Sequence, residues 1–278
     1  MAKAKKEESK LWDSVRSVES FPEFNKLKAL VFGPSGSGKS TLAARFKKPL
    51  IGLTEAQAVP AIQSANPDAL IKMITDVEEL GEFRQLLRDP ELPNRVDAVV
   101  LDSLTDAQRI LKEHYTARQT RRQDKTDMDT WGTIIDGTAR LAREVRDLPV
   151  HVCVICLDAE NQVDGLGLVH RPAVSGKRLP NDLAQYFNLV GFTHVAELDN
   201  GFRHQIMFRS DERYLTKTME GIGGTEPQEP LLWVQKRFGG SLDKNSAKRV
   251  SEWKDLELIA EPVNNGETSE GSDPFSGI

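Results

Sequence analysis

One stretch near the N-terminus constrains the fold and chemistry of this chain more than any other. Residues 33–40 read Gly-Pro-Ser-Gly-Ser-Gly-Lys-Ser and fit the pattern G-x-x-x-x-G-K-[ST]. The apolar segment Leu27–Phe32 predicts a strand before this stretch, and Thr41–Lys47 predicts the opening of a helix after it. A strand, a glycine-rich turn and a helix allow successive backbone N–H groups to point at one phosphate group. The sequence therefore predicts a phosphate-binding P-loop.

Every fixed position of the pattern is filled, which favours a true nucleotide site over a chance match. Lys39 would reach the β- and γ-phosphates, and the Ser40 hydroxyl would be a ligand of Mg²⁺. ATP and Mg²⁺ are thus the expected cofactors. The candidate nucleotide-binding residues are Gly33, Pro34, Ser35, Gly36, Ser37, Gly38, Lys39, Ser40 and Thr41.

A carboxylate at the end of a second apolar run adds to this site. Val96–Asp102 predicts a buried strand that ends in Asp102, and Ser103 follows directly. In an open α/β sheet the carboxyl ends of the strands face the bound ligand, so Asp102 would lie near the P-loop. There it would hold Mg²⁺ through water. The alternative is a core strand that merely ends in an acid.

The remaining pattern alternates strands and helices, which predicts an α/β fold with a mainly parallel central sheet flanked by helices. Later in the chain, strands at Leu189–Glu197 and Phe202–Arg209 flank the turn Asp199-Asn200-Gly201, which predicts an antiparallel hairpin extension. Further strands are expected at Pro49–Glu55, Ala69–Ile74, Val150–Leu157 and, at an edge, Arg213–Lys217, and helices at Asp76–Arg88, Leu104–Gln119, Thr130–Leu148, Asn181–Asn188 and Ser246–Ile259.

Composition narrows the surroundings and partners of the chain. The net charge of −5 argues against a uniformly basic DNA-binding surface. No apolar run approaches the length of a membrane span, and the charged N-terminus is not a secretory signal, so a cytoplasmic protein without a membrane partner is expected. Cys153 and Cys156 lie three positions apart on a predicted strand and point to opposite faces. They are therefore expected to be buried and reduced, and to share no metal.

Three parts are expected along the chain. Residues 1–24 form a leader that carries apolar residues at helical spacing, either a helix packed on its own domain or an arm that docks on a neighbour. Residues 25–238 form the main domain, and residues 239–278 form a polar, acidic tail that is largely disordered. Between two helices, Arg118, Arg121, Arg122 and Lys125 form either ordinary solvated surface or a contact for nucleic acid.

Four segments together resemble a known family. The P-loop G-P-S-G-S-G-K-S-T, V-V-L-D-S-L-T at Asp102, S-G-K-R-L-P at Ser175–Pro180 and R-Y-L-T-K at Arg213–Lys217 resemble the ATPase core of RecA-like recombinases. The closer resemblance is to small phage-encoded RecA/AAA-type ATPases, the single-strand-annealing recombinases sometimes called the Sak-four group. The resemblance spans roughly residues 25–235. It implies a RecA-like core that hydrolyses ATP, binds single-stranded DNA and works as a homo-oligomer, either a ring or a filament.

The resemblance also implies roles for single residues. Glu55 matches the carboxylate that orients the attacking water, while Ser103 and Asp158 occupy sensor positions. The recombinases usually have an amide in place of Asp158, so the acid is a departure. The segment Gly165–Lys177 matches a DNA-binding loop, with phosphate contacts from Arg171, Lys177 and Arg178. Cations that would reach a neighbour's nucleotide are Arg213 and Lys217.

Two other functions stay open on the sequence. A P-loop kinase or phosphotransferase would need an acceptor pocket and a lid, for which Arg118–Arg122 is a candidate, but Glu55 is better suited to activating water. An accessory ATPase of a phage replication or packaging machine would act through its acidic tail. The tail segment Ser272-Asp273-Pro274-Phe275 resembles the tails of single-strand-binding proteins, which makes such a protein a candidate partner. A GTPase is disfavoured, because no N-K-x-D motif follows the P-loop.

Overall fold

The computed structural model describes Val15 and residues 25–118, 126–198, 201–209 and 212–259. The rest of the N-terminal leader, three of the four cations of the predicted basic cluster (Arg121, Arg122 and Lys125) and the acidic residues beyond 259 lie outside the described residues. None of the described helices combines the length and the apolarity that crossing a membrane requires.

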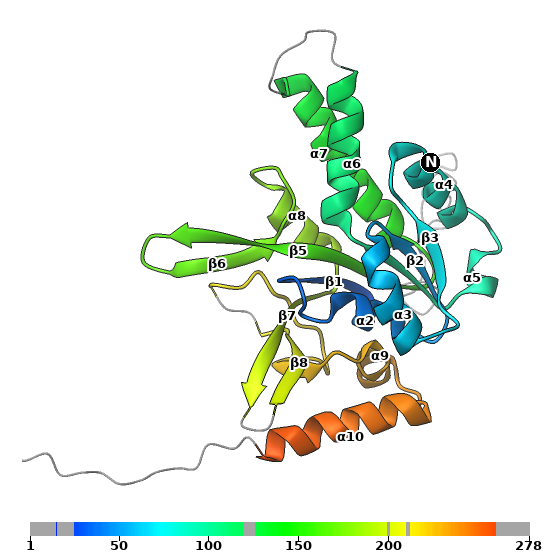
Figure 1. The fold of residues 1–278 in the computed structure, drawn as a ribbon, viewed down its shortest axis with the longest axis vertical. Coiled ribbons are helices and arrows are strands. Elements are labelled where there is room, and N and C mark those ends of the chain that lie inside the picture. Colours follow the sequence, from blue (N-terminus) through cyan, green and yellow to red (C-terminus); the bar gives the residue numbers. More distant parts are fainter. Residues whose placement is uncertain (1–14, 16–24, 119–125, 199–200, 210–211, 260–278) are drawn as a thin grey trace, which may run out of the picture.

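A nine-stranded sheet forms the centre of the molecule (Figure 1). Its strands are β1 (Lys28–Gly33), β2 (Pro49–Leu53), β3 (Leu70–Met73), β4 (Ala98–Asp102), β5 (His151–Val163), β6 (Gly167–Pro172), β7 (Leu189–Leu198), β8 (Gly201–Met207) and β9 (Thr225–Pro227). The order is β3-β2-β4-β5-β1-β7-β8-β9, and β6 pairs with β5. The strands from β3 to β7 in this order run parallel, whereas β8 and β9 are antiparallel. The predicted α/β fold and its hairpin extension are therefore confirmed.

Helices cover both faces of the sheet. They are α2 (Lys39–Ala44), η3 (Ala56–Ala58), α3 (Val59–Ala65), α4 (Val77–Leu87), α5 (Leu92–Arg95), α6 (Leu104–Ala117), α7 (Met128–Arg146), α8 (Leu179–Tyr186), α9 (Pro230–Phe238) and α10 (Lys244–Ile259). One hydrophobic core joins the sheet to α4, α6, α7 and α8, and the other joins it to α2, α3, α9 and α10. Cys156 belongs to the first core and Cys153 to the second, so the two thiols do lie on opposite faces, both free and buried.

Strand β5 is longer than its apolar run predicts. The predicted strand stops before Asp158, but β5 continues to Val163 and folds back into β6, with Asp158 opposite Pro172 and Val163 opposite Gly167. This two-stranded ribbon projects from the sheet (Figure 1) and exposes much of its surface, so backbone pairing forms it without an apolar pattern. The predicted DNA-binding loop Gly165–Lys177 is therefore wrong as a loop, because most of it is β6 and the turn before it.

Two further corrections concern the C-terminal part. Arg213–Lys217 is not an edge strand, since Tyr214 and Lys217 make only isolated bridges, to His170 and Val190. The tail predicted at 239–278 is not disordered throughout, because α10 forms within it, as the helical pattern at Ser246–Ile259 predicts. Helix α10 packs against α9, whose helix has no counterpart among the predicted elements. The folded body therefore extends past the predicted boundary at residue 238.

Candidate nucleotide site

The P-loop connects β1 to α2 and is fixed from the far side of the sheet. Gly38 has a φ of 92°, and a Cβ atom there would lie 2.5 Å from the Gln228 side-chain oxygen, so glycine suits this position on both counts. The buried Ser37 hydroxyl donates to the Pro34 carbonyl at 2.8 Å and lies 2.7 Å from the Thr193 hydroxyl. The Gln228 amide donates to the Ser37 carbonyl at 2.7 Å. The loop is thus held in shape by β7 and by the residue after β9.

Lys39 lies under this loop and is almost fully buried. Its Nζ donates to the Gly33 carbonyl at 2.8 Å and to the Pro34 carbonyl at 2.6 Å. Burial lowers the Lys39 pKa, while the negative charge of Asp102 acts in the opposite direction. Neutral carbonyls are weak partners for a buried ammonium group. Phosphate oxygens in the loop would supply the charged acceptors that this amine lacks.

Asp102 ends β4 beside the P-loop and carries a strained charge. The residue is 8% exposed, and its Oδ2 atom is buried without a hydrogen-bond partner in the described part of the chain. Burial raises the Asp102 pKa to about 6, although a hydrogen bond with Ser40 and the charge of Lys39 oppose the rise. A hydroxyl next to a carboxylate with a free oxygen is the all-oxygen donor set that Mg²⁺ prefers. Ser40 and Asp102 therefore fit a magnesium ion.

The parallel pairing of β2 with β4 brings a second carboxylate to the same edge. Leu53 pairs with Asp102, so Thr54 and Glu55 follow β2 where β4 also ends. The Thr54 hydroxyl donates to the Asp102 carbonyl at 3.1 Å and accepts from the Ser103 N–H at 3.0 Å, which joins the two strand ends. Glu55 accepts a hydrogen bond of 3.0 Å from the Gln57 side chain. The acidic edge is thus tied together by backbone contacts, while Glu55 keeps only a local, exposed partner.

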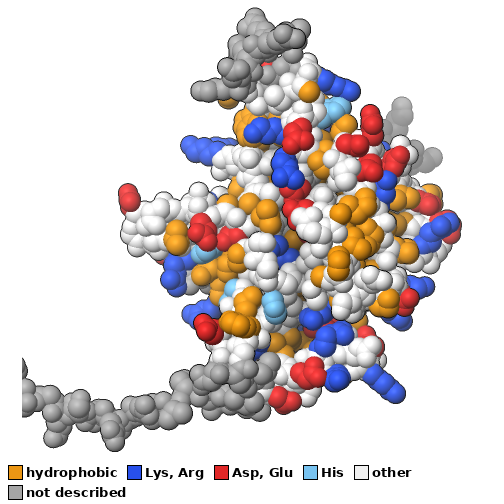
Figure 2. Space-filling view, in the orientation of Figure 1, with side chains coloured by type: hydrophobic (Ala, Val, Ile, Leu, Met, Phe, Trp, Pro, Cys, Tyr) orange, Lys and Arg blue, Asp and Glu red, His pale blue; other side chains and the backbone are white. Residues whose placement is uncertain are grey.

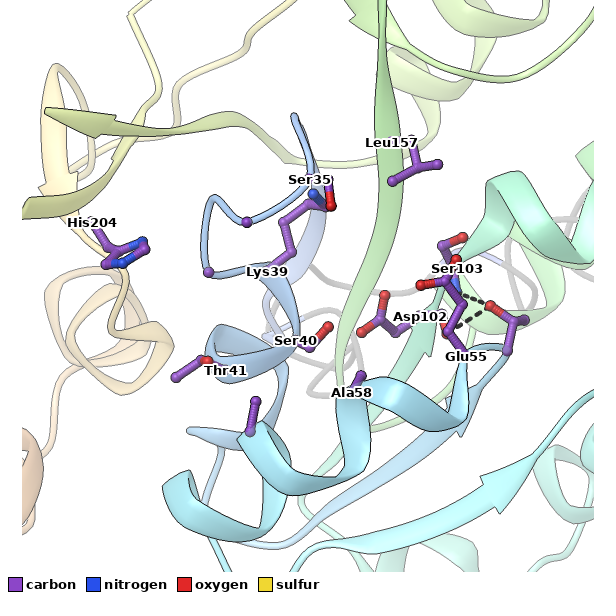
Figure 3. Close-up of a pocket in the computed structure, with 14 residues that line it drawn as sticks. Ser35, Lys39, Ser40, Thr41, Glu55, Ala58, Asp102, Ser103, Leu157 and His204 are labelled. Carbon is purple, nitrogen blue, oxygen red and sulfur yellow. Dashed lines mark hydrogen bonds between the residues drawn. The ribbon is translucent and has the colours of Figure 1, made fainter.

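These parts surround one cavity of about 280 Å³ (Figure 3). In Figure 3, Glu55, Asp102 and Ser103 gather on one side of Lys39 and Ser40, and His204 lies on the other side. The lining residues are Ser35, Gly36, Gly38, Lys39, Ser40, Thr41, Thr54, Glu55, Ala58, Ala61, Asp102, Ser103, Leu157 and His204. The structure therefore brings the predicted catalytic residues, both predicted metal ligands and most of the P-loop into one space.

The two predicted sensor residues lie in different environments. Ser103 lines the cavity, but its hydroxyl donates to Asp106 at 2.7 Å and accepts from the Asp106 N–H, which caps α6. Asp158 does not line the cavity, although its neighbour Leu157 does. Its Oδ2 atom lies 2.6 Å from His170 Nδ1, and burial raises its pKa, opposed by the interaction with His170. Asp158 thus has a partner on β6 in place of the expected position at a strand end.

The predicted DNA-binding and trans-acting cations lie away from the cavity. Arg171 is on β6, and Lys177 and Arg178 are exposed in the turn before α8. Arg213 is exposed, and Lys217 donates from its Nζ to the Phe187 carbonyl at 2.8 Å. None of these five described cations lines the cavity of its own chain.

Sequence reasoning missed His204 and Gln228. His204 is exposed on β8, and a Cβ atom added to Gly38 would lie 3.0 Å from its Nδ1 atom, which places the imidazole against the P-loop. Neither residue belongs to a motif or to an apolar pattern. Both reach the loop only because β8 and β9 add to the sheet next to β7, and that pairing leaves no local trace in the sequence.

The fold and the cavity define a P-loop nucleotide-binding protein of the α/β class. A family model described as "AAA domain" matches residues 25–219, and the chain belongs to this family of P-loop ATPase domains. No curated protein matches the sequence.

Two solved structures share the fold at low similarity. A KaiC-like protein from Pyrococcus horikoshii aligns with 10% identity and a TM-score of 0.38, over 64% of this chain and 76% of the other. The flagellar accessory protein FlaH from Methanocaldococcus jannaschii aligns with 8% identity and a TM-score of 0.33, over 66% and 77%. At these values neither likeness carries a functional argument.

Proposed function

We propose that this chain binds Mg²⁺–ATP at the P-loop and hydrolyses it. One observation carries the proposal: a buried Asp102 oxygen without a partner faces Ser40, in the cavity that also holds Lys39 and Glu55. The backbone of residues 33–41 would hold the phosphates, and Lys39 would neutralise the β- and γ-phosphates. Ser40 and Asp102 would hold Mg²⁺, which spreads the charge that develops on the phosphates.

Glu55 favours water as the acceptor of the phosphoryl group. It lines the cavity on the Asp102 side, and its printed hydrogen bond is to a local side chain, Gln57. A carboxylate in that position can orient a water and take its proton as the bond to the γ-phosphorus forms. A kinase would instead release phosphate slowly until an acceptor molecule is added, so phosphate release without any added acceptor separates the two functions.

We further propose that ATP use serves the binding and annealing of single-stranded DNA by a homo-oligomer. The resemblance of four segments to annealing recombinases supports this, as do the exposed cations Lys177 and Arg178 after the β5–β6 ribbon. Figure 2 shows acidic and basic side chains mixed over the visible face, so a DNA contact would be local and would not cover the whole face. Arg213 and Lys217 are candidates to reach a neighbour's nucleotide, and a single-strand-binding protein is a candidate partner.

The decisive experiment measures ATP hydrolysis with and without single-stranded DNA, beside a sizing column. We expect stimulation by DNA, and retention of DNA in a gel shift that weakens as salt rises. The double variant Lys177→Ala/Arg178→Ala should lose DNA retention, whereas the matched pair Lys244→Ala/Lys248→Ala on α10 should keep it. Hydrolysis indifferent to DNA, together with no retention at low salt, would refute the DNA proposal and leave the ATPase proposal standing.

A further inference from the structure

Three side chains with metal-binding atoms meet on the β5–β6 ribbon, outside the nucleotide cavity. The ligand atoms of Asp158, Glu160 and His170 all lie within 4.8 Å of one another. The strand geometry explains this meeting. Asp158 and Glu160 are two positions apart on β5 and share a face, and His170 pairs directly with Glu160 across the ribbon. The ribbon therefore places two carboxylates and one imidazole on the same surface.

The carboxylate of Asp158 is the least satisfied member of the cluster. Its side chain is 5% exposed, and its Oδ2 atom lies 2.6 Å from His170 Nδ1. Its second oxygen, Oδ1, is buried and has no hydrogen-bond partner among the residues that the structure describes. A buried carboxylate oxygen without a partner is costly, and one imidazole contact satisfies only half of this group. A cation at the cluster would satisfy the other half.

The imidazole is already oriented for such a role. The His170 ring stacks on Tyr214 at 4.8 Å with an interplanar angle of 5°, and it also lies 5.0 Å from the Phe192 ring. The His170 N–H donates to the Arg213 carbonyl at 2.7 Å, which fixes the backbone on the other side. Packing thus holds Nδ1 toward Asp158. Glu160 is exposed and free to turn inward, so the third ligand can adjust to a bound ion.

We propose that Asp158, Glu160 and His170 form a binding site for a divalent transition-metal ion, best matched by Zn²⁺. One imidazole and two carboxylates are ligands that Zn²⁺ accepts, with a fourth position left for water. Mg²⁺ prefers oxygen ligands alone, so this site is distinct from the Ser40–Asp102 site. On binding, the His170 Nδ1 proton leaves and the nitrogen lone pair bonds the metal. The Asp158–His170 pair then opens to about 3.3 Å, the spacing of two ligands each about 2 Å from a tetrahedral ion.

The bound ion would act where the ribbon leaves the sheet. Leu157, the residue before Asp158, lines the nucleotide cavity, and the charge of Asp158 reaches Lys39. A metal that ties β5 to β6 at this point would stiffen the base of the ribbon and remove the unpaired carboxylate from the surroundings of the P-loop lysine.

The test uses the full chain without a histidine tag, stripped with a chelator and free of nucleotide. We expect calorimetry to show one Zn²⁺ bound per chain, and Co²⁺ to give the visible absorption of a protein-bound ion. Glu160→Gln, an exposed change that spares the fold, should weaken binding at least about tenfold. The matched control Asp164→Asn, an exposed carboxylate in the turn of the same ribbon, should bind as the parent does.

Two further arms make the outcome unambiguous. His170→Gln should also lose the Co²⁺ absorption, and circular dichroism will show whether the variant is folded. Lys39→Ala should keep full Zn²⁺ affinity, so a failure of the nucleotide proposal would not resemble a failure of this one. Absence of Zn²⁺ and Co²⁺ binding to the parent chain would overturn the proposal, and so would equal binding by the parent and Glu160→Gln.

Discussion

Asp102 is expected to lower the stability of the nucleotide-free protein, because its position serves the metal and not the fold. Its carboxyl is buried, one oxygen has no partner, and burial raises its pKa to about 6. Asp102→Asn keeps the shape, keeps an oxygen that can accept from Ser40, and removes the charge. We therefore expect this variant to unfold at a higher temperature than the parent at pH 8, while it loses Mg²⁺-dependent ATP hydrolysis.

The magnitude follows from the two pKa values. Between the ordinary value of 3.8 and about 6, the folded state binds more protons at Asp102 than the unfolded state does, so stability falls as pH rises through this window. The full difference is about 3 kcal/mol and is complete above about pH 6. It is an upper bound for the gain in the variant, because Lys39 also loses the attraction of Asp102. For a chain of this size it corresponds to about 6–10 °C in Tm.

The assay is thermal unfolding in a chelating buffer without nucleotide, at pH 8 and at pH 5. At pH 5 about half of the gain should remain, because the parent carboxyl is then mostly protonated in the folded state. Asp164→Asn, which removes an exposed carboxylate, controls for the change in net charge and should shift Tm little at either pH. A Tm gain that is absent at pH 8, or equal at both pH values, would refute the view of Asp102 as a strained charge.

Three other substitutions and one truncation test the site and its support. Lys39→Ala should reduce kcat/KM at least about 100-fold with loss of nucleotide affinity, measured with a fluorescent analogue. Glu55→Gln should keep that affinity and reduce kcat about 10²–10⁴-fold; an equal loss of both would remove Glu55 from the role of base. His204→Ala should weaken nucleotide binding by less than about tenfold and leave kcat unchanged, whereas a fall in kcat alone would contradict its place at the P-loop end of the cavity. A chain that ends at residue 240 lacks α10 and leaves the buried Glu229 without Arg249, so it should lose about 3–5 kcal/mol of unfolding free energy, and Glu229→Gln should restore part of this loss.

Continuous apolar runs made the core of this fold predictable. Each parallel strand is buried on both faces, so the segments before Gly33 and Asp102 read as unbroken hydrophobic stretches. The P-loop is a local motif, and the rule that parallel strands present their carboxyl ends at one edge placed Glu55 and Asp102 beside it. The cap of α4 was equally local, since Asp76 accepts from two backbone N–H groups of the first turn.

The missed features depend on surroundings that the local sequence does not show. The ribbon formed by β5 and β6 is polar on its exposed length, so its ladder is held by backbone pairing. Asp158 was placed at a strand end because the apolar pattern stops there, whereas the backbone continues. Helix α9 did carry a local signal, Pro230 at its first position, but the glycine-rich segment before it favoured a loop.

The nucleotide loop depends on residues beyond the region that the family model matches. That region ends at residue 219, yet Gln228 holds the Ser37 carbonyl, and its own carbonyl accepts from Arg45 at the end of α2. Gln228 is in turn positioned by Trp233, which is fully buried and donates to the Pro227 carbonyl. Because a P-loop works by pre-set backbone geometry, contacts that fix Ser37 and Gly38 act on phosphate binding without touching phosphate. The C-terminal segment through α10 is therefore part of the nucleotide-binding unit and not an appendage to it.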